Sequence, residues 1–440
     1  MNIRKRLPAF ESKDYRLWFA GQSISLIGTW LQTTGQSWLV LKLTNSPLKL
    51  GLLTSIQFLP SLILSVFIGP VIDRYPKRSI LLFTQIMFAL AAAALAVVAF
   101  GGHAQFWQVL VIATFTGLIS VIDWPTRHSF VVEQVNDRSA VANAVALNST
   151  MFNIARVIGP GIGGVLIAAV GIPWTFTLNS ISFIAVIVSL LLMKAGRKPT
   201  KSNKGSYAQE VREGTQYIAR NQVIMNLLTI AGIISLFLFN FNIFIPSFAK
   251  LTLGLQADGY GGLLSAMGVG ALAAGVLLSL GGARLEPTPA YIYGSGFILA
   301  VAMVLVGIQR NFYVTSLLLV FCGFGMSILS TTCNTALQLQ SPDSMRGRVM
   351  AAFNLVLVGS TPIGALYAGK ICDALGANMG FFVSGVIGVV FLGVMMAFVT
   401  RRTFRGLRTF AVADSSAGGG SQTVGSSDGL DARAAGVDKD

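Results

Sequence analysis

Long apolar runs dominate the chain and decide what it can fold into. Twelve of them alternate with short polar connections along the first 400 residues. About 20 apolar residues in a helix cross the hydrocarbon core of a bilayer, and helix is favoured because unpaired backbone amides are costly in lipid. We therefore expect an all-α membrane protein with twelve transmembrane helices. The runs cover residues 17–41, 48–72, 79–100, 106–124, 146–170, 173–194, 223–250, 259–282, 289–308, 312–335, 348–371 and 377–399.

Composition excludes an ordinary soluble domain and a nucleic-acid binder. Apolar residues make up 53% of the chain and charged residues 11%, whereas a typical soluble domain carries about 25% charge. The net charge of +15 would suit a nucleic-acid partner. However, the basic residues flank apolar runs and do not gather in one patch interleaved with aromatic residues. The partner that the sequence predicts is the lipid bilayer, and no nucleic acid is expected.

The distribution of basic residues predicts the topology. With the N-terminus placed in the cytoplasm, most of the 32 Lys and Arg residues fall in the N-terminus, in every second connection and in the C-terminal tail. Cytoplasmic loops carry this excess in membrane proteins, so we expect a multi-pass protein of the cell inner membrane with both termini cytoplasmic. No cleavable signal peptide is expected. The exceptions are Lys42, Lys49, Lys250, Arg310 and Lys370 on the other side, and Arg156 inside a span.

One long polar segment divides the spans six and six. It covers residues 195–221, and its end predicts an amphipathic helix near the membrane surface. The two halves are expected to be pseudo-symmetric, because shifting the chain places Gly117 on Gly323. The expected organisation is a cytoplasmic N-terminus (1–16), a six-helix bundle (17–194), a cytoplasmic linker (195–221), a second six-helix bundle (222–400) and a cytoplasmic, disordered tail (401–440).

The connection between the second and third spans carries the most specific motif. Its sequence GPVIDRYPKR resembles the signature loop of the major facilitator superfamily in position, spacing and side of the membrane. The resemblance implies a latch on the cytoplasmic gate, made by an acid that faces a helix N-terminus and by three bases. The alternative is a solvated basic loop. The residues concerned are Gly69, Asp73, Arg74, Lys77 and Arg78.

A second motif lies in the fifth span. The stretch ARVIGPGIGG resembles the motif associated with exporters and antiporters of that superfamily through Gly159, Pro160, Gly163 and Gly164. Small residues permit close helix packing, and a proline bends the helix. Ala146 and Ala155 stand where the full motif has glycines, so a generic packing face remains the alternative. The same glycines do not form a dinucleotide site, because no strand precedes them.

The chain up to about residue 400 resembles a bacterial exporter family within the superfamily, the one that contains the enterobactin exporter and macrolide-efflux-like proteins. The stretches YRLWFAGQSISLIGTW, VVEQVNDRSAVANAVALNS and EVREGTQYIARNQVI also carry this resemblance. It implies a secondary active transporter, a proton-coupled and monomeric exporter of drug- or siderophore-like small molecules that works by alternating access. One alternative is an uptake symporter or facilitator for a small solute. The other is a membrane receptor or enzyme on a transporter-like scaffold, for which we find no His/Asp cluster; we expect no enzyme.

Ionisable residues inside spans are functional candidates. Arg156 lies about two turns into the fifth span, where it contacts either a substrate or counter-ion or a packed neighbour. Asp123 lies one turn before Arg127 near the cytoplasmic end of the fourth span. It either carries a proton or pairs with Arg127 or with the signature-loop bases, and we favour the pairing, with a role in gating. Asp373, at the far end of the eleventh span, is expected to be solvated.

Polar residues in the spans predict a cavity between spans 1, 4, 5, 7, 10 and 11. The first span has no acid, so the usual position of a proton carrier is vacant, but it carries a one-sided polar face. Each cavity candidate could equally be a hydrogen bond between helices. Two histidines and three separated cysteines predict neither a metal site nor a cofactor. The polar face is Ser25, Thr29, Gln32, Thr33 and Gln36, and further candidates are Gln57, Asn153, Asn240 and Asn354.

Overall fold

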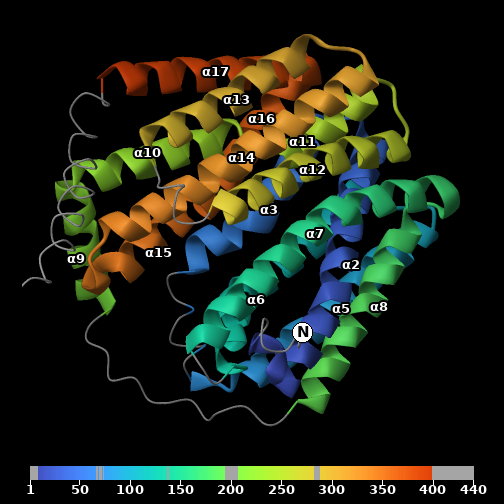
Figure 1. Ribbon diagram of the computed structural model, residues 1–440. Helices are drawn as coiled ribbons and strands as arrows, with labels where there is room; N and C mark the ends of the chain where they lie inside the picture. Colours follow the sequence, from blue (N-terminus) through green and yellow to red (C-terminus); the bar gives the residue numbers. More distant parts are fainter. Residues whose placement is uncertain are drawn as a thin grey trace, which may run out of the picture.

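The computed structural model describes residues 8–65, 68, 72, 74–135, 138–193, 207–281 and 288–398. The described residues fold almost entirely into helices (Figure 1). The first half contains η1 (Pro8–Glu11), α2 (Lys13–Thr44), α3 (Pro47–Leu64), α5 (Lys77–Phe100), α6 (Phe106–Glu133), α7 (Arg138–Val170) and α8 (Pro173–Leu192).

The second half repeats this arrangement after the helix α9 (Tyr207–Arg220), which lies where the amphipathic linker helix was expected. Glu213 of α9 pairs with Arg348 at 2.9 Å, so α9 is tied to the second half. The elements that follow are α10 (Gln222–Phe237), α11 (Phe241–Ser247), the π-helix η3 (Phe248–Thr252), α12 (Ala257–Gly281), α13 (Pro289–Ile308), α14 (Phe312–Gln340), α15 (Asp343–Gly359), α16 (Thr361–Leu375) and α17 (Ala377–Phe398).

Short turns with capping side chains separate the helices. At the α2–α3 turn, Asn45 adopts a positive φ of 50° and ends α2, a conformation that asparagine tolerates better than most residues. Ser46 then accepts a hydrogen bond from the backbone N–H of Lys49 and begins α3. Asn221 and Asn311 cap α10 and α14 in the same way. These local signals explain why one helix ends and the next begins at these points.

Eleven helical segments of the described part are long and apolar enough to cross a membrane. α2 is not among these eleven segments. Its 32 residues are nevertheless long enough to cross a membrane, and it packs against α7 and α8. Counting α2 gives the twelve spans that the sequence predicts. Some predicted ends were wrong: α6 continues to Glu133, and α7 begins at Arg138. Polar and charged residues continue these helices beyond their apolar runs, so hydropathy alone ends them too early.

The two halves form two helical bundles that meet along two seams, α7 against α12 and α3 against α16. We call the end where α2 begins and α9 lies the linker end, and the end with the α2–α3 turn the turn end. Figure 1 shows the helices of the two bundles converging at the turn end and diverging toward the linker end. Eleven spanning segments in this arrangement confirm the predicted fold class.

Matching glycine contacts support the pseudo-symmetry of the bundles. A side chain at Gly117 of α6 would run into the backbone of Gln57 in α3, and one at Gly323 of α14 would run into the backbone of Met267 in α12. In both bundles, the fourth span therefore packs directly on the second. The sequence repeat that aligns these two glycines thus corresponds to a repeated helix contact.

Candidate functional site

The bases of the signature loop are bonded within the first bundle. Gly69 and Asp73 lie outside the described residues, and Arg74 is exposed. Lys77, at the start of α5, pairs with Glu133 at the end of α6, with 2.5 Å between Nζ and Oε1. Arg78 donates from Nε to the carbonyl of Leu190 at 2.6 Å and from Nη2 to that of Leu191 at 3.0 Å. A cation there satisfies the carbonyls at the C-terminus of α8.

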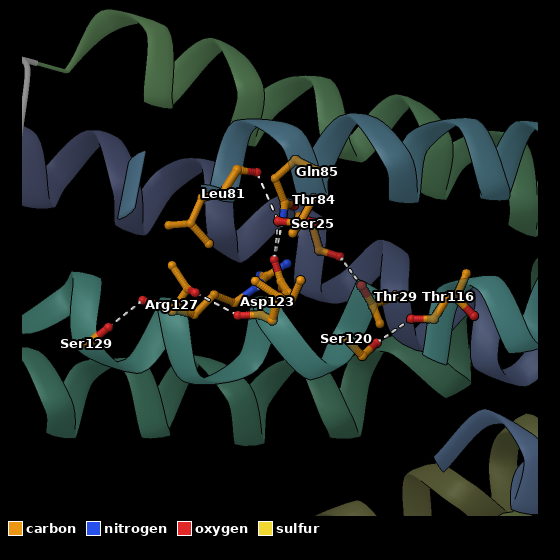
Figure 2. A network of polar contacts seen from close by, with 12 residues as sticks. Ser25, Thr29, Leu81, Thr84, Gln85, Thr116, Ser120, Asp123, Arg127 and Ser129 are labelled. Atoms are coloured by element: carbon orange, nitrogen blue, oxygen red, sulfur yellow. Dashed lines mark hydrogen bonds and ion pairs between the residues drawn. The ribbon is translucent and has the colours of Figure 1, made fainter. Parts of the chain in front are cut away.

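Asp123 lies in a buried polar network between α5 and α6 of the first bundle (Figure 2). Its Oδ1 accepts hydrogen bonds from Thr84 Oγ1 at 2.6 Å and from Gln85 Nε2 at 2.9 Å, both on α5. Its Oδ2 pairs with the Nε of Arg127, one turn along α6. Three donors fit an ionised carboxylate. Lys77 and Arg78 of the signature loop contact other groups, and Asp123 pairs with Arg127.

The small residues of the fifth-span motif pack α7 against two different helices. Gly159 lies against Trp30 of α2, and Gly163 lies against Thr34 of the same helix. Gly164 faces the second bundle instead, where an added Cβ would lie 2.6 Å from the carbonyl oxygen of Ala257 in α12. Pro160 is buried. The motif therefore joins α7 to its own bundle on one face and to the partner bundle on another.

Arg156 lies one turn before this motif, in the middle of α7. Its Nη2 lies 3.5 Å from the Sδ of Met326 on α14, in the other bundle. No carboxylate among the described residues lies within ion-pair distance of it. Arg156 is thus a charged side chain that crosses the interface between the bundles without an acidic partner in the described part of the chain.

The polar face of α2 splits into different environments. Gln32 accepts a hydrogen bond at 2.7 Å from Asn179 of α8, so it joins two helices of one bundle. Thr29 is exposed and Thr33 is partly exposed, and their hydroxyls donate to carbonyls of their own helix. Ser25 and Gln36 are buried, and the Ser25 hydroxyl and the Gln36 amide nitrogen have no hydrogen-bond partner in the described part. The face that the pattern predicts is therefore not one continuous lining.

The remaining polar candidates are also spread out. Asn153 donates to the carbonyl of Ser149 in its own helix. Asn240, between α10 and α11, donates to the carbonyl of Leu236 in α10 and packs against Gly364 of α16. Gln57 is partly exposed, and its backbone lies against Gly117. Asn354 is exposed on α15. Asn153 lies one turn before Arg156 on α7, and no hydrogen bond in the described part of the chain joins any of these four side chains to Arg156.

Two charged residues at the turn end were not singled out from the sequence as contacts between the bundles. Lys250 of η3 donates to the carbonyl of Leu41 at 2.6 Å and to Asn45 Oδ1 at 2.8 Å, at the C-terminus of α2. Asp373 of α16 accepts from Ser46 Oγ at 2.7 Å, at the N-terminus of α3. Asp373 is exposed, as expected, but it also holds the α2–α3 turn. No local pattern could reveal these pairs, because their members lie far apart in the sequence.

In the part of the chain that the structure describes, no hydrogen bond joins the two bundles near the linker end. In addition to the turn-end bonds and the contact of Arg156, a hydrogen bond joins α12 to α7: Ser265 Oγ donates to the carbonyl of Val157 at 3.0 Å. The rings of Trp38 and Tyr260 stack across the same interface at 5.6 Å. The bundles are therefore joined from the middle to the turn end.

Comparisons with known proteins agree on one family. Residues 6–411 match the model of a family described as transmembrane secretion effector. The chain is 25% identical over 397 residues to the staphyloferrin A transporter of Staphylococcus aureus, covering 88% of this chain and 96% of that protein. It is 24% identical to the multidrug efflux pump Tap of Mycolicibacterium fortuitum, covering 83% and 90%. It is also 20% identical to macrolide efflux protein A of Streptococcus pyogenes, covering 85% and 93%.

Solved structures show the same fold. A bacterial homologue of the human lysosomal transporter Spinster, in an inward-facing and unoccupied conformation, aligns with a TM-score of 0.68 and 16% identity over 90% of this chain and 98% of that one. The nucleoside transporter NupG aligns with a TM-score of 0.67 and 11% identity over 88% and 98%. Both are transporters and not enzymes, as expected for this chain. The fold is that of the major facilitator superfamily.

Proposed function

Because the chain belongs to the transmembrane secretion effector family of the major facilitator superfamily, we propose that it is a proton-coupled exporter of small organic molecules. Of the relatives named above, one is named a transporter of staphyloferrin A, one a multidrug efflux pump and one a macrolide efflux protein. The proposed cargo is accordingly drug- or siderophore-like. The linker end faces the cytoplasm in this proposal, and the protein lies in the inner membrane as a monomer.

The observation that carries the mechanism is the one-sided contact between the bundles. Bonds join them from the middle to the turn end, while the helices diverge toward the linker end (Figure 1). This arrangement supports an inward-facing state, open to the cytoplasm. Alternating access then needs a second state, in which the turn-end contacts break and the linker end closes. Cargo or protons drive the change through their different affinities for the two states.

The signature loop supplies the latch of that second state in our proposal. Asp73, Arg74 and Arg78, together with Asp123, stabilise the outward-facing state by closing the linker end. In the present state, Arg78 and Asp123 are both occupied inside the first bundle. Closure therefore needs Arg74 and Asp73 to find partners on the second bundle, or Arg78 to leave the carbonyls of α8.

Transport by inside-out membrane vesicles tests the proposed function. Vesicles from cells that make the protein should accumulate amphiphilic fluorescent dyes when their lumen is acidified, and vesicles without it should not. Asp73→Asn should abolish accumulation while the amount of inserted protein stays the same, because the latch loses its charge. Asp258→Asn, an exposed acid at the turn end, serves as the matched control. Dye movement only out of the vesicles would support uptake instead, and full activity of the Asp73 variant would refute the latch.

A further inference from the structure

Arg156 holds a fixed position on α7, between two packing faces. At Gly159 and Gly163, one face of α7 packs against α2. At Val157, Gly161 and Gly164, another face of α7 packs against α12. At 100° per residue, position 156 lies between these two faces. The side chain extends from there to Met326 of α14. Its guanidinium therefore lies where helices of both bundles meet, at the depth of the middle of the spans.

The charge of Arg156 is not balanced by an acid in the described part of the chain. Asp123, the acid furthest from any helix end there, is already held by Thr84, Gln85 and Arg127. Asp373 holds the α2–α3 turn, and Glu133 pairs with Lys77, both at the ends of the bundles. A charged group within a membrane span normally has a partner of opposite sign. The thioether of Met326 is at most a weak acceptor.

We propose that Arg156 binds a carboxylate of the transported molecule, so that the cargo is a small organic acid. A guanidinium presents parallel N–H groups that match the two oxygens of a carboxylate. One positive charge balances one negative charge, which favours a carboxylate over a doubly charged phosphate. Contact with helices of both bundles gives the bound anion different surroundings in the two states, as coupling requires. This inference rests on the proposed export function and specifies its cargo.

Binding to the purified full-length protein in lipid nanodiscs tests the inference. The probes are N-dansylglycine and its methyl ester, in which a methyl group on the carboxyl removes the negative charge. The wild type should bind the acid more tightly than the ester. Arg156→Gln should weaken binding of the acid by about ten- to hundredfold, as expected for a lost bond to a charged group, and leave the ester unchanged. Arg156→Lys should retain part of the preference, because the charge stays while the paired donors are lost.

Arg310→Gln is the matched control, since Arg310 is exposed beyond the end of α13 and should not affect either probe. Equal binding of acid and ester by the wild type would overturn the inference, as would an unchanged preference in Arg156→Gln. Binding of neither probe would also contradict it. In each of these cases, dye accumulation by inside-out vesicles would still decide the export function separately. A thermal unfolding curve for each variant shows whether a loss of binding reflects a loss of fold.

Discussion

The Asp123 carboxylate shows how a charge is kept in the interior of a helical bundle. It is 3% exposed, and its two oxygens receive hydrogen bonds from Thr84, Gln85 and Arg127. Lys77 and Glu133 form the same kind of pair at the linker end, but their side chains are 21% and 32% exposed. Because water screens the Lys77–Glu133 pair more than the buried Asp123 carboxylate, the two pairs should differ in their effect on stability.

Replacing Asp123 with Ala should therefore lower the free energy of unfolding by about 3 kcal/mol or more, since the buried Thr84 and Gln85 would lose their acceptor and Arg127 its counter-charge. Replacing Lys77 with Ala should lower it by less than about 1 kcal/mol. Thermal unfolding of both variants in the same detergent measures the difference. Equal losses of stability in the two variants would show that the Asp123 network is hydrated and that its burial is not decisive.

The sequence identified Asp123, Arg127 and Arg156 because a charged residue stands out in an apolar run. It did not predict that Gln32 would accept a hydrogen bond from Asn179 and so be separated from the other polar residues of α2. That contact depends on which face of α2 the neighbouring α8 covers. Lys250 and Asp373 were equally unpredictable, since each contacts the α2–α3 turn from another bundle. The sequence thus shows which side chains in the spans are charged or polar, but it does not show which residues they contact across the interface.

The turn between α2 and α3 is held by charges that match the two helix ends. The C-terminus of α2 carries partial negative charge and receives Lys250, while the N-terminus of α3 carries partial positive charge and receives Asp373. Both residues belong to the second bundle, and the turn belongs to the first. These contacts join the two bundles at the turn end, and the outward-facing state that we propose must break them.

Replacing both residues, Lys250→Gln and Asp373→Asn, should shift the protein toward the outward-facing state. If each contact contributes about 1 kcal/mol, the population ratio changes by roughly thirtyfold. A cysteine in place of Ser265, which bridges α12 and α7, reports on the opening through its rate of reaction with an impermeant maleimide added outside the cell. The three buried native cysteines are replaced with Ala in this background.

The rate of maleimide reaction should rise in the double variant. The control pair, Lys49→Gln and Asp258→Asn, removes one base and one acid at the same end without touching these contacts. It should leave the rate unchanged. An equal rise in both backgrounds would mean that charge at the turn end matters in general and that the specific pairing with the helix ends does not.

The number and order of the membrane spans could be predicted from the sequence more fully than the contacts between them. The apolar runs placed the spans, because burial in lipid acts on each helix separately. They ended α6 and began α7 at the wrong residues, since those helices continue through polar residues to Glu133 and from Arg138. The state of the molecule was not predictable, because the two states that we propose use the same helices and differ only in the seams between the bundles.

The central claim is that the two bundles rock about their shared interface. Spin labels on α6 and α14 measure this directly, with one pair at Val132 and Leu339 near the linker end and a second pair at Trp107 and Tyr313 near the turn end, all exposed positions. Pulsed electron paramagnetic resonance in nanodiscs measures the distance between the two labels of each pair, in the wild type and in the Lys250 and Asp373 double variant. We predict that the linker-end distance shortens while the turn-end distance lengthens. Distances that stay fixed at both ends, or that change in the same direction, would contradict the account.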